Sequence, residues 1–313
     1  MNIKLIDRLT HDFDPETYLV EEGLRHAAEV AFALRQPLLL MGEPGTGKTR
    51  FAQKLAHELA KQNASSGYHF LDKPLVFNTK TNSTARDLFY TYDALAHFQS
   101  ANIRRDTGQA VPTTADFITL QAYGQAIAQT NPATVPHPRL REGLLPDPAS
   151  TVVLIDEIDK APRDFPNDLL NELDNQECFI RELDNLPLRR AADQSIVVVL
   201  TSNSEKNLPD AFLRRCVFYH IPFPDRDQLL AIARSTLGTE TTHLDQLIEM
   251  FENVRKKALR KAPGTAEMLA WLRIVGLQNI QNLESADNKR LLRQNLSILV
   301  KTKEDYDAVK DLF

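Results

Sequence analysis

Residues 37–49, which read PLLLMGEPGTGKT, constrain the fold of this chain more than any other stretch. They contain the pattern G-x-x-x-x-G-K-[ST], a glycine-rich loop whose backbone N–H groups cradle the phosphates of a nucleotide. The apolar run Leu38–Met41 precedes the loop, as expected of a strand buried on both faces. After the loop, Phe51, Leu55 and Leu59 recur at helical spacing, with alanines beside them. Strand, loop and helix thus follow in the order that sets an anion at a helix N-terminus, so the sequence predicts binding of a nucleoside triphosphate.

The predicted phosphate-binding residues are those of the loop itself. Its glycines permit a tight turn of the backbone, and Lys48 supplies a mobile charge for the β- and γ-phosphates, which also makes it a candidate catalytic residue. The Thr49 hydroxyl is a candidate Mg²⁺ ligand. The full set is Gly42, Glu43, Pro44, Gly45, Thr46, Gly47, Lys48 and Thr49.

A second apolar run, Val152–Ile155, ends in two carboxylates. We expect Asp156 to hold Mg²⁺ opposite Thr49, and Glu157 to accept a proton from the water that attacks the γ-phosphate, or to orient that water. An apolar run ending in Asp-Glu is a weak pattern alone, because ordinary strands also end this way. About a hundred residues after a phosphate-binding loop, it indicates a hydrolase.

A third apolar run, Ile196–Leu200, ends in Thr201, Ser202 and Asn203. Because ligands bind at the carboxyl ends of strands in open α/β folds, Asn203 is a candidate for orienting the water together with Glu157. The alternative is an ordinary turn or capping asparagine.

Two arginines, Arg214 and Arg215, end the short helix predicted over residues 210–216. Arginines in a last helical turn ordinarily interact with the helix dipole and remain solvated. Their place just after the polar end of a strand suggests a charge offered to the γ-phosphate of a neighbouring subunit.

The remaining patterns divide the chain into two predicted domains. Two further strands are expected over Leu75–Asn78 and Val217–Ile221, completing a nucleotide-binding core over residues 1–222. Helical patterns without strand patterns follow the linker 222–225, which predicts a small all-α domain over residues 223–313. We expect residues 79–149 to form an insertion or loop region whose proline-rich end at 131–148 projects from the core.

Three further helices are predicted inside or beside this core. Apolar spacing indicates one within Glu16–Leu34, a second over Asp87–Ser100 and a third over Asp168–Cys178. The first of these helices precedes the first strand, and Tyr18–Val20 near its start could touch a nucleotide base or could pack into the core.

Charge and composition exclude several classes of protein. The net charge of −5 gives no electrostatic reason to expect nucleic acid or an anionic membrane as a partner. Apolar runs reach only about five residues, against the roughly 20 that span a bilayer. Acidic residues interrupt the N-terminal stretch where a signal peptide needs an apolar core, and only two cysteines, Cys178 and Cys216, are present. We therefore expect a cytoplasmic protein without membrane insertion.

Together these motifs resemble those of the AAA+ ATPases, and specifically of their MoxR-like branch, over residues 16–303. The matching segments are GEPGTGKT at 42–49, VVLIDE at 152–157, TSN at 201–203 and AFLRRC at 211–216. The resemblance implies an αβα sandwich with a five-stranded parallel sheet, followed by a helical lid, with ATP bound at a subunit boundary. Arg215 best matches the arginine that the family supplies to its neighbour, with Arg214 as the alternate.

The resemblance also implies a ring, usually a hexamer, that remodels a partner protein, often one with a von Willebrand factor A-like domain. One departure from the family pattern is present. The family carries an arginine at the start of a lid helix, whereas the corresponding segment, Ala262–Glu267, has none. Arg273, two turns further on, is a candidate substitute.

Our functional hypothesis is an ATP-hydrolysing remodelling protein that uses Mg²⁺. The alternative is a regulatory switch that binds ATP and turns it over slowly. The missing lid arginine favours the switch, whereas intact Glu157, Asn203 and Arg215 favour hydrolysis. A GTPase is disfavoured because the chain has no Asn-Lys-x-Asp guanine signature.

Overall fold

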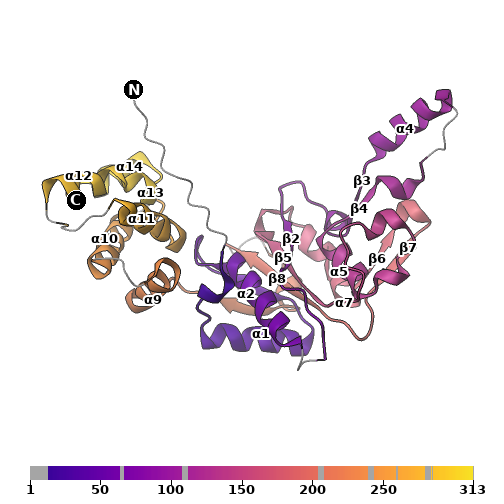
Figure 1. Ribbon diagram of the computed structural model, residues 1–313, viewed down its shortest axis with the longest axis horizontal. Helices are drawn as coiled ribbons and strands as arrows, with labels where there is room; N and C mark the ends of the chain where they lie inside the picture. The colour runs from indigo at the N-terminus through magenta and orange to yellow at the C-terminus, as the bar shows by residue number, and fades with distance from the viewer. Residues whose placement is uncertain are drawn as a thin grey trace.

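A computed structural model of the chain is shown in Figure 1. It describes residues 13–63, 67–107, 112–203, 208–238, 243–258, 260–278, 283 and 285–312.

A five-stranded, wholly parallel sheet forms the centre of the fold, as the sequence predicts. Leu38 is paired with Val199 on one side and with Val217 on the other, so the strand before the phosphate loop has neighbours on both edges. All five carboxyl ends therefore meet at one edge of the sheet. In spatial order the strands are β2 (Leu75–Asn78), β5 (Thr151–Asp156), β8 (Ile196–Ser202), β1 (Leu38–Met41) and β9 (Val217–His220).

Helices cover both faces of this sheet, which makes it the middle layer of an αβα sandwich (Figure 1). Leu38 and Leu40 pack on one face in a cluster with α1 (Glu22–Leu34) and α2 (Lys48–Lys61). Leu39 and Met41 face the opposite cluster. Every residue of β1 is buried, because both of its faces are covered. Elements with residues in the second cluster include α5 (Ala122–Thr130), α6 (Phe165–Asp168), α7 (Leu170–Asn175) and α8 (Asp210–Leu213).

The first predicted helix begins later than its apolar spacing suggests. Pro15–Thr17 is a short 3₁₀ helix, η1, and the backbone is extended at Tyr18 and still extended at Glu21. The helix α1 starts only at Glu22, so residues 18–21 form a strap rather than a helical turn.

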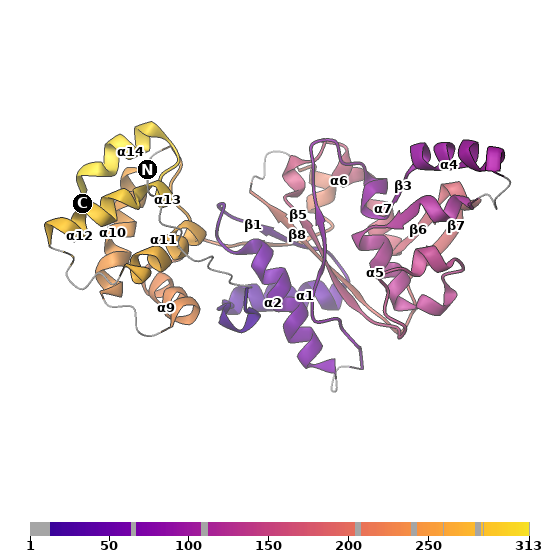
Figure 2. The same ribbon diagram turned by 45° about the horizontal axis from the view of Figure 1, so that its top comes forward.

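The helix predicted over Asp87–Ser100 is wrong in its first half. A 3₁₀ turn, η2 (Ala85–Leu88), leads into β3 (Tyr90–Tyr92), which pairs with β4 (Ile118–Leu120), and α4 (Ala94–Thr107) follows. Tyr90 is buried and its hydroxyl donates 2.8 Å to Glu182, which stabilises the strand. Asp93 caps α4 by accepting from the N–H of Ala96 at 2.8 Å. Figure 2 shows α4 extending away from the core.

The proline-rich stretch 131–148 does not project from the core, contrary to expectation. Val135 and Leu140 are each 1% exposed and belong to the cluster under the sheet. The Gln129 side chain binds two groups of this stretch, Leu145 N and Asp147 O, both at 2.8 Å. Two 3₁₀ turns, η4 (Pro132–Thr134) and η5 (Pro138–Arg141), give it local structure.

The helix predicted to end at Cys178 ends earlier, at Asn175. Gln176 adopts a left-handed conformation, with φ at 51°, which stops α7. Cys178 then lies in β6 (Glu177–Ile180), which pairs antiparallel with β7 (Leu186–Arg189) beyond the 3₁₀ turn η7 (Arg181–Leu183). Cys178 and Cys216 are both free thiols.

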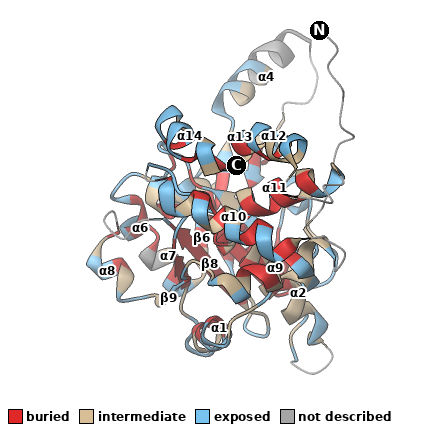
Figure 3. Ribbon diagram, turned by 90° about the vertical axis from the view of Figure 1, so that its left-hand side faces the viewer, coloured by how far each residue is buried: buried red, intermediate tan, exposed pale blue. Residues whose placement is uncertain are grey.

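The C-terminal region is helical and has a hydrophobic core of its own around Trp271 and Phe251. Asp225 and Gln228 form a reciprocal capping box that starts its first helix. Figure 3 shows the buried residues gathered on the facing sides of α9, α10 and α11. Its elements are α9 (Arg226–Leu237), α10 (Leu244–Lys257), α11 (Thr265–Leu277), α12 (Ala286–Gln294), α13 (Leu296–Leu299), α14 (Lys303–Val309) and η8 (Lys310–Leu312). Of the helices within the described ranges, none is long and apolar enough to cross a membrane.

Candidate nucleotide-binding site

A cavity of about 420 Å³ lies where the carboxyl edge of the sheet meets the C-terminal helices. This volume is within the range of about 300–1,000 Å³ typical of small-molecule sites. Three parts of the chain line it: the strap with its neighbours, the phosphate loop with the strand ends, and the first part of the helical region. Lining residues from these parts include Tyr18, Leu19, Val20, Pro44–Arg50, Asp156, Glu157, Thr201, Asn203, Gln228, Ile232 and Thr265.

The phosphate loop has the backbone geometry that its glycines predict. Gly47, which caps the N-terminus of α2, has φ at +91°, a conformation that strains any residue with a side chain. A Cβ atom on Gly42 would lie 2.5 Å from the carbonyl oxygen of Ile221. The loop therefore turns back closely on β9, and its N–H groups lie at the start of a helix, where they can bind anions.

Lys48 is 7% exposed, and its ammonium group is held inside the loop. Its Nζ donates to the carbonyl oxygens of Gly42 at 2.8 Å and Glu43 at 2.9 Å. Burial lowers the pKa of Lys48, while the nearby carboxylates, Asp156 first among them, act to raise it. A cation at this position fits the polyphosphate of a nucleotide.

Asp156 connects Thr49, in the first turn of α2, with Thr201, near the end of β8. Its Oδ1 accepts from Thr49 Oγ1 at 3.0 Å and from Thr201 Oγ1 at 2.6 Å. A carboxylate beside a hydroxyl provides the oxygen ligands that Mg²⁺ prefers, and Mg²⁺ commonly uses only one or two protein ligands together with phosphate and water. The residues predicted to hold the metal are thus adjacent, and their chemistry fits the ion. No sequence motif gives Thr201 a role, although its position at a strand end is evident from the sequence.

Glu157 and Asn203 both line the cavity. Glu157 is held in a left-handed conformation, with φ at 55°, and its N–H donates 2.8 Å to Thr201 Oγ1. Its carboxylate forms an ion pair with Lys160, which lies one turn on in η6 (Ile158–Lys160). The N–H of Asn203 donates 3.3 Å to Asp159. The structure therefore brings both candidate catalytic residues to the cavity wall, and it adds Asp159 and Lys160 as neighbours that sequence reasoning did not single out.

Arg214 and Arg215 lie outside the cavity lining, just after α8. The Arg215 side chain is 48% exposed, and its Nε lies 3.5 Å from Asp174 Oδ2 on α7. Arg215 is therefore not positioned to contact a nucleotide in the cavity of its own subunit.

A family model for AAA domains of the dynein-related subfamily matches residues 37–216, more than half of the chain. This chain belongs to that AAA family. Membership implies ATP binding, typically with Mg²⁺, and ATPase activity. The matched residues of this AAA protein run from the strand before the phosphate loop to the end of the arginine segment, so they include every candidate catalytic residue.

Similarity to individual proteins is more distant than the family match. CD-NTase-associated protein 6 of Pseudomonas aeruginosa is 26% identical over 193 residues, which cover 61% of this chain. Because the match covers 49% of that relative, the chain spans about half the length of the curated protein it matches. The structure of C. elegans PCH-2 aligns with a TM-score of 0.45 at 16% identity, covering 95% of this chain and 70% of that one. A likeness this distant carries no functional argument.

The strap of the AAA protein lies at the cavity and also packs on the core, so both roles considered for Tyr18–Val20 are compatible with its position. All three residues line the cavity, and the Tyr18 ring also packs on Phe51 of α2 with centroids 6.2 Å apart. Burial raises the pKa of the Tyr18 hydroxyl well above its usual value. An uncharged aromatic side chain is thus available at the cavity for a base.

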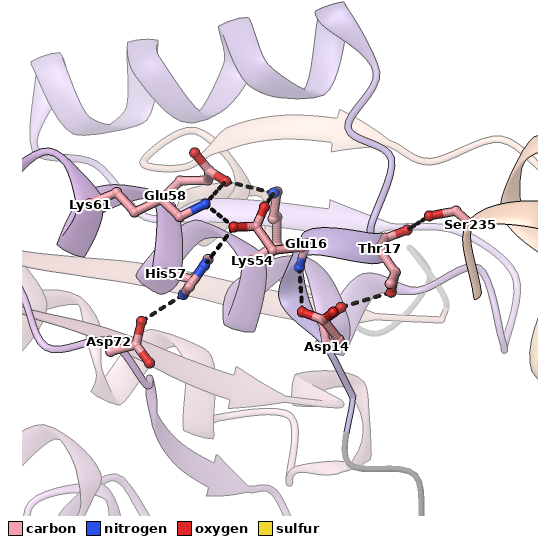
Figure 4. Close-up of polar contacts among 9 residues, drawn as sticks. All are labelled: Asp14, Glu16, Thr17, Lys54, His57, Glu58, Lys61, Asp72 and Ser235. Carbon is pink, nitrogen blue, oxygen red and sulfur yellow. Dashed lines mark hydrogen bonds and ion pairs between the residues drawn. The ribbon is translucent and has the colours of Figure 1, made fainter. Parts of the chain in front are cut away.

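Polar contacts hold the N-terminal side of the strap on α2 (Figure 4). Glu16 accepts from His57 Nε2 at 3.3 Å and pairs with Lys54 at 3.6 Å and with Lys61. His57 Nδ1 lies 2.6 Å from Asp72 Oδ1. These contacts fix one end of the cavity wall to the helix that starts at the phosphate loop. No sequence pattern pointed to them.

The helical region contacts both ends of the strap. At its N-terminal end, Ser235 on α9 donates 2.8 Å to the carbonyl oxygen of Thr17, the last residue of η1 (Figure 4). On the other side, Gln228 donates 2.9 Å to Glu21. The strap therefore bridges the core and the first helix of the C-terminal region.

The segment Ala262–Glu267, where the motif resemblance leads us to expect an arginine, lies at the phosphate loop. A Cβ atom on Gly264 would lie 2.8 Å from the carbonyl oxygen of Pro44. The candidate substitute Arg273 does not line the cavity. Burial lowers its pKa, as does the nearby guanidinium of Arg50, and its Nε is buried without a hydrogen-bond partner among the described residues.

Proposed function

We propose that this AAA protein binds Mg·ATP in the cavity and hydrolyses it to ADP and phosphate. The observation that supports the proposal is the contact of Asp156 with both Thr49 and Thr201, together with the hydrogen bond from the Glu157 N–H to Thr201. This constellation can hold a metal–phosphate complex and activate water next to it.

Each residue of the site has a distinct proposed role. Lys48 and the loop N–H groups bind the β- and γ-phosphates, while Thr49 and Asp156 hold Mg²⁺, whose charge would offset that of the phosphates. Glu157 accepts the proton of the attacking water, and Asn203 orients that water. In this scheme Lys48, the loop N–H groups and Mg²⁺ stabilise the charge of the phosphates, while Glu157 accepts the proton of the attacking water.

Arg215, with Arg214 as the alternate, is proposed to act on the nucleotide of a neighbouring subunit. Support comes from its exposure and from its position outside its own cavity. The catalytically complete form would then be an oligomer. The assembly we propose is a ring, with six subunits as in the family that the motifs resemble.

We propose further that the protein is MoxR-like and remodels a partner protein in the cytoplasm, with a von Willebrand factor A-like domain as the candidate partner fold. The motif resemblance supports this finer assignment. In this scheme residues 1–222 form the ATP-binding core and residues 223–313 form a lid, since the helical region has its own hydrophobic cluster. No nucleic-acid partner is proposed.

Residues 79–149 are proposed to carry partner contacts rather than catalysis. The helix α4 within them exposes two large apolar side chains, Leu95 and Phe98, each 66% exposed. Exposed apolar side chains on a helix that extends from the core are suited to binding another protein.

A regulatory switch with slow turnover is the second candidate function. The observation that favours it is the absence of an arginine from the segment 262–267 at the phosphate loop.

Phosphate release from Mg·ATP by the wild type and by Lys48→Ala tests the proposal. We expect turnover by the wild type and none by the variant, which also loses nucleotide binding in a titration while keeping its circular dichroism spectrum. Wild-type ATP affinity in a folded Lys48→Ala protein would refute the assigned phosphate site. Tight binding with turnover slower than about one per hour by the assembled wild type would favour the switch.

A further inference from the structure

Arg255, in the last turn of α10, contacts the phosphate loop from the helical region. Its Nη2 forms an ion pair with the carboxylate of Glu43. The arginine side chain is 17% exposed, whereas that of Glu43 is 55% exposed, so the cation is the more enclosed partner. This pair joins two segments that lie 212 residues apart in the sequence.

Two further contacts fix the orientation of the Arg255 guanidinium. Its Nη1 donates 2.8 Å to the carbonyl oxygen of Pro263, and its central carbon lies 3.5 Å from the centroid of the Phe223 ring. Phe223 belongs to the linker between β9 and α9, and Pro263 closely precedes α11. A planar guanidinium held by stacking and by a hydrogen bond loses little further entropy when it binds a carboxylate. Arg255 is therefore held in place for Glu43.

Glu43 also supports the lysine of the phosphate loop. Its carbonyl oxygen accepts from Lys48 Nζ at 2.9 Å and from Thr46 Oγ1 at 2.9 Å. The next residue, Pro44, is in close contact with Gly264, as described above. The helical region thus touches the phosphate loop at the Glu43 side chain and along the backbone of Pro44 and Gly45.

We propose that Arg255 is a positioning residue that couples the helical region to the phosphate loop through Glu43. In this chain the pair provides a guanidinium link between the helical region and the loop, whereas the segment 262–267, which also lies against the loop, has no arginine. Arg255 contacts a residue of the phosphate loop rather than the phosphate itself, because its guanidinium is already paired with the Glu43 carboxylate. The inference extends the proposed function, since it concerns the same nucleotide site.

Hydrogen exchange of the nucleotide-free protein tests the coupling without reference to activity. In Arg255→Met, which keeps the apolar stem but loses the charge and the fork, we expect faster exchange at residues 42–49 and 264–268. Glu43→Gln should give the same pattern, and the double variant should exchange no faster than either single one. Arg255→Lys, a milder change that guards against misfolding, should give an intermediate result because ammonium cannot stack or bind as a fork.

Nucleotide affinity provides the second readout, with a fluorescent ATP analogue as the probe. We expect the Kd of Arg255→Met to be about tenfold larger than that of the wild type, which is the size of effect expected for one hydrogen bond to a charged group. Arg226→Ala is the matched control, because Arg226 pairs with Glu249 and Glu252 inside the helical region and not with the loop. It should leave the Kd and the exchange of residues 42–49 unchanged.

Unchanged exchange of residues 42–49 in folded Arg255→Met would overturn the inference, as would fully additive effects of the Arg255 and Glu43 variants. A wild-type protein that shows the coupled exchange but binds no ATP analogue would refute the proposed function and leave the coupling standing.

Discussion

Thr49 Oγ1 lies 3.0 Å from Asp156 Oδ1, although 107 residues separate the two in the sequence. Asp156 ends β5, and Thr49 lies in the first turn of α2. Parallel strands bring their carboxyl ends to one edge, so the loop after β1 and the last residue of β5 meet there. The contact joins the phosphate-binding loop to the carboxylates at the end of β5.

Thr201 is expected to matter for turnover, because its hydroxyl donates to Asp156 at 2.6 Å and accepts from Glu157 N at 2.8 Å. Thr201→Val should lower the rate of phosphate release by about 10- to 100-fold, since hydrogen bonds to charged groups carry about 1.5–3 kcal/mol. Thr201→Ser, which keeps the hydroxyl, is the control and should stay close to the wild type. Equal rates for the valine and serine variants would remove Thr201 from the site.

Arg215→Ala is expected to leave ATP binding largely unchanged and to lower turnover. An arginine supplied to the transition state of a neighbour can contribute about 10³–10⁵ in rate. The specific activity of the wild type should also rise with protein concentration as subunits associate.

Mixing experiments separate a trans-acting arginine from a structural one. Arg215→Ala subunits should inhibit wild-type subunits, and folded Lys48→Ala subunits should restore activity to Arg215→Ala partners by donating the missing arginine. Concentration-independent activity from a monomer, unaffected by Arg215→Ala, would exclude this role and leave the switch as the better account.

Much of this site follows from sequence because its residues come directly after buried strands. Strands such as β1 are apolar throughout, so the sequence shows where each strand ends. The polar residues that follow parallel strands lie at the same edge of the sheet. The contacts of Glu16 with α2 could not be predicted, since they join a short turn to a helix through side chains that carry no pattern. Likewise, β3 could not be predicted, because Leu88 and Tyr92 also fit a helical period. The strand is stabilised by the tertiary contacts of Tyr90, which the sequence pattern does not show.

The exposed apolar residues of α4 are expected to serve partner binding. Leu95→Ser with Phe98→Ser should leave the melting temperature and basal phosphate release unchanged, because both side chains are 66% exposed. In the ATP-trapping Glu157→Gln background, the same changes should abolish stable capture of a partner. Leu277→Ser, at a residue 53% exposed on α11, is the control that should retain capture. Retained capture by the α4 variant would place the partner surface elsewhere.

The contacts of Glu16 predict a pH-dependent contribution to stability. Hydrogen bonds from Lys61 and His57 lower the pKa of Glu16 from 4.5 to about 2, so its contribution is full above pH 4.5 and is lost toward pH 2. The Asp72 carboxylate raises the pKa of His57 above 6.5, so the His57 contribution is present below that value and is lost as pH rises through the raised pKa.

Thermal unfolding of the wild type and of Glu16→Gln measures this contribution. The difference in midpoint should be largest between about pH 4.5 and 6.5, smaller above that window, where the lysine contacts remain, and absent near pH 2. Glu29→Gln is the control, since Glu29 and its histidine neighbour are 66% and 77% exposed. A difference that does not vary with pH would contradict the assigned contacts.

Glu157→Gln tests the central claim, ATP hydrolysis at this site, most directly. The amide keeps the shape of the carboxylate but cannot accept the proton, and Glu157 lies on the cavity wall next to the residues that would hold Mg·ATP. The measurement is single-turnover hydrolysis of radiolabelled ATP, with bound nucleotide quantified in parallel. We expect Glu157→Gln to retain ATP with near wild-type affinity and to cleave it at least about a hundredfold more slowly. Cleavage at the wild-type rate by the folded variant would contradict the account.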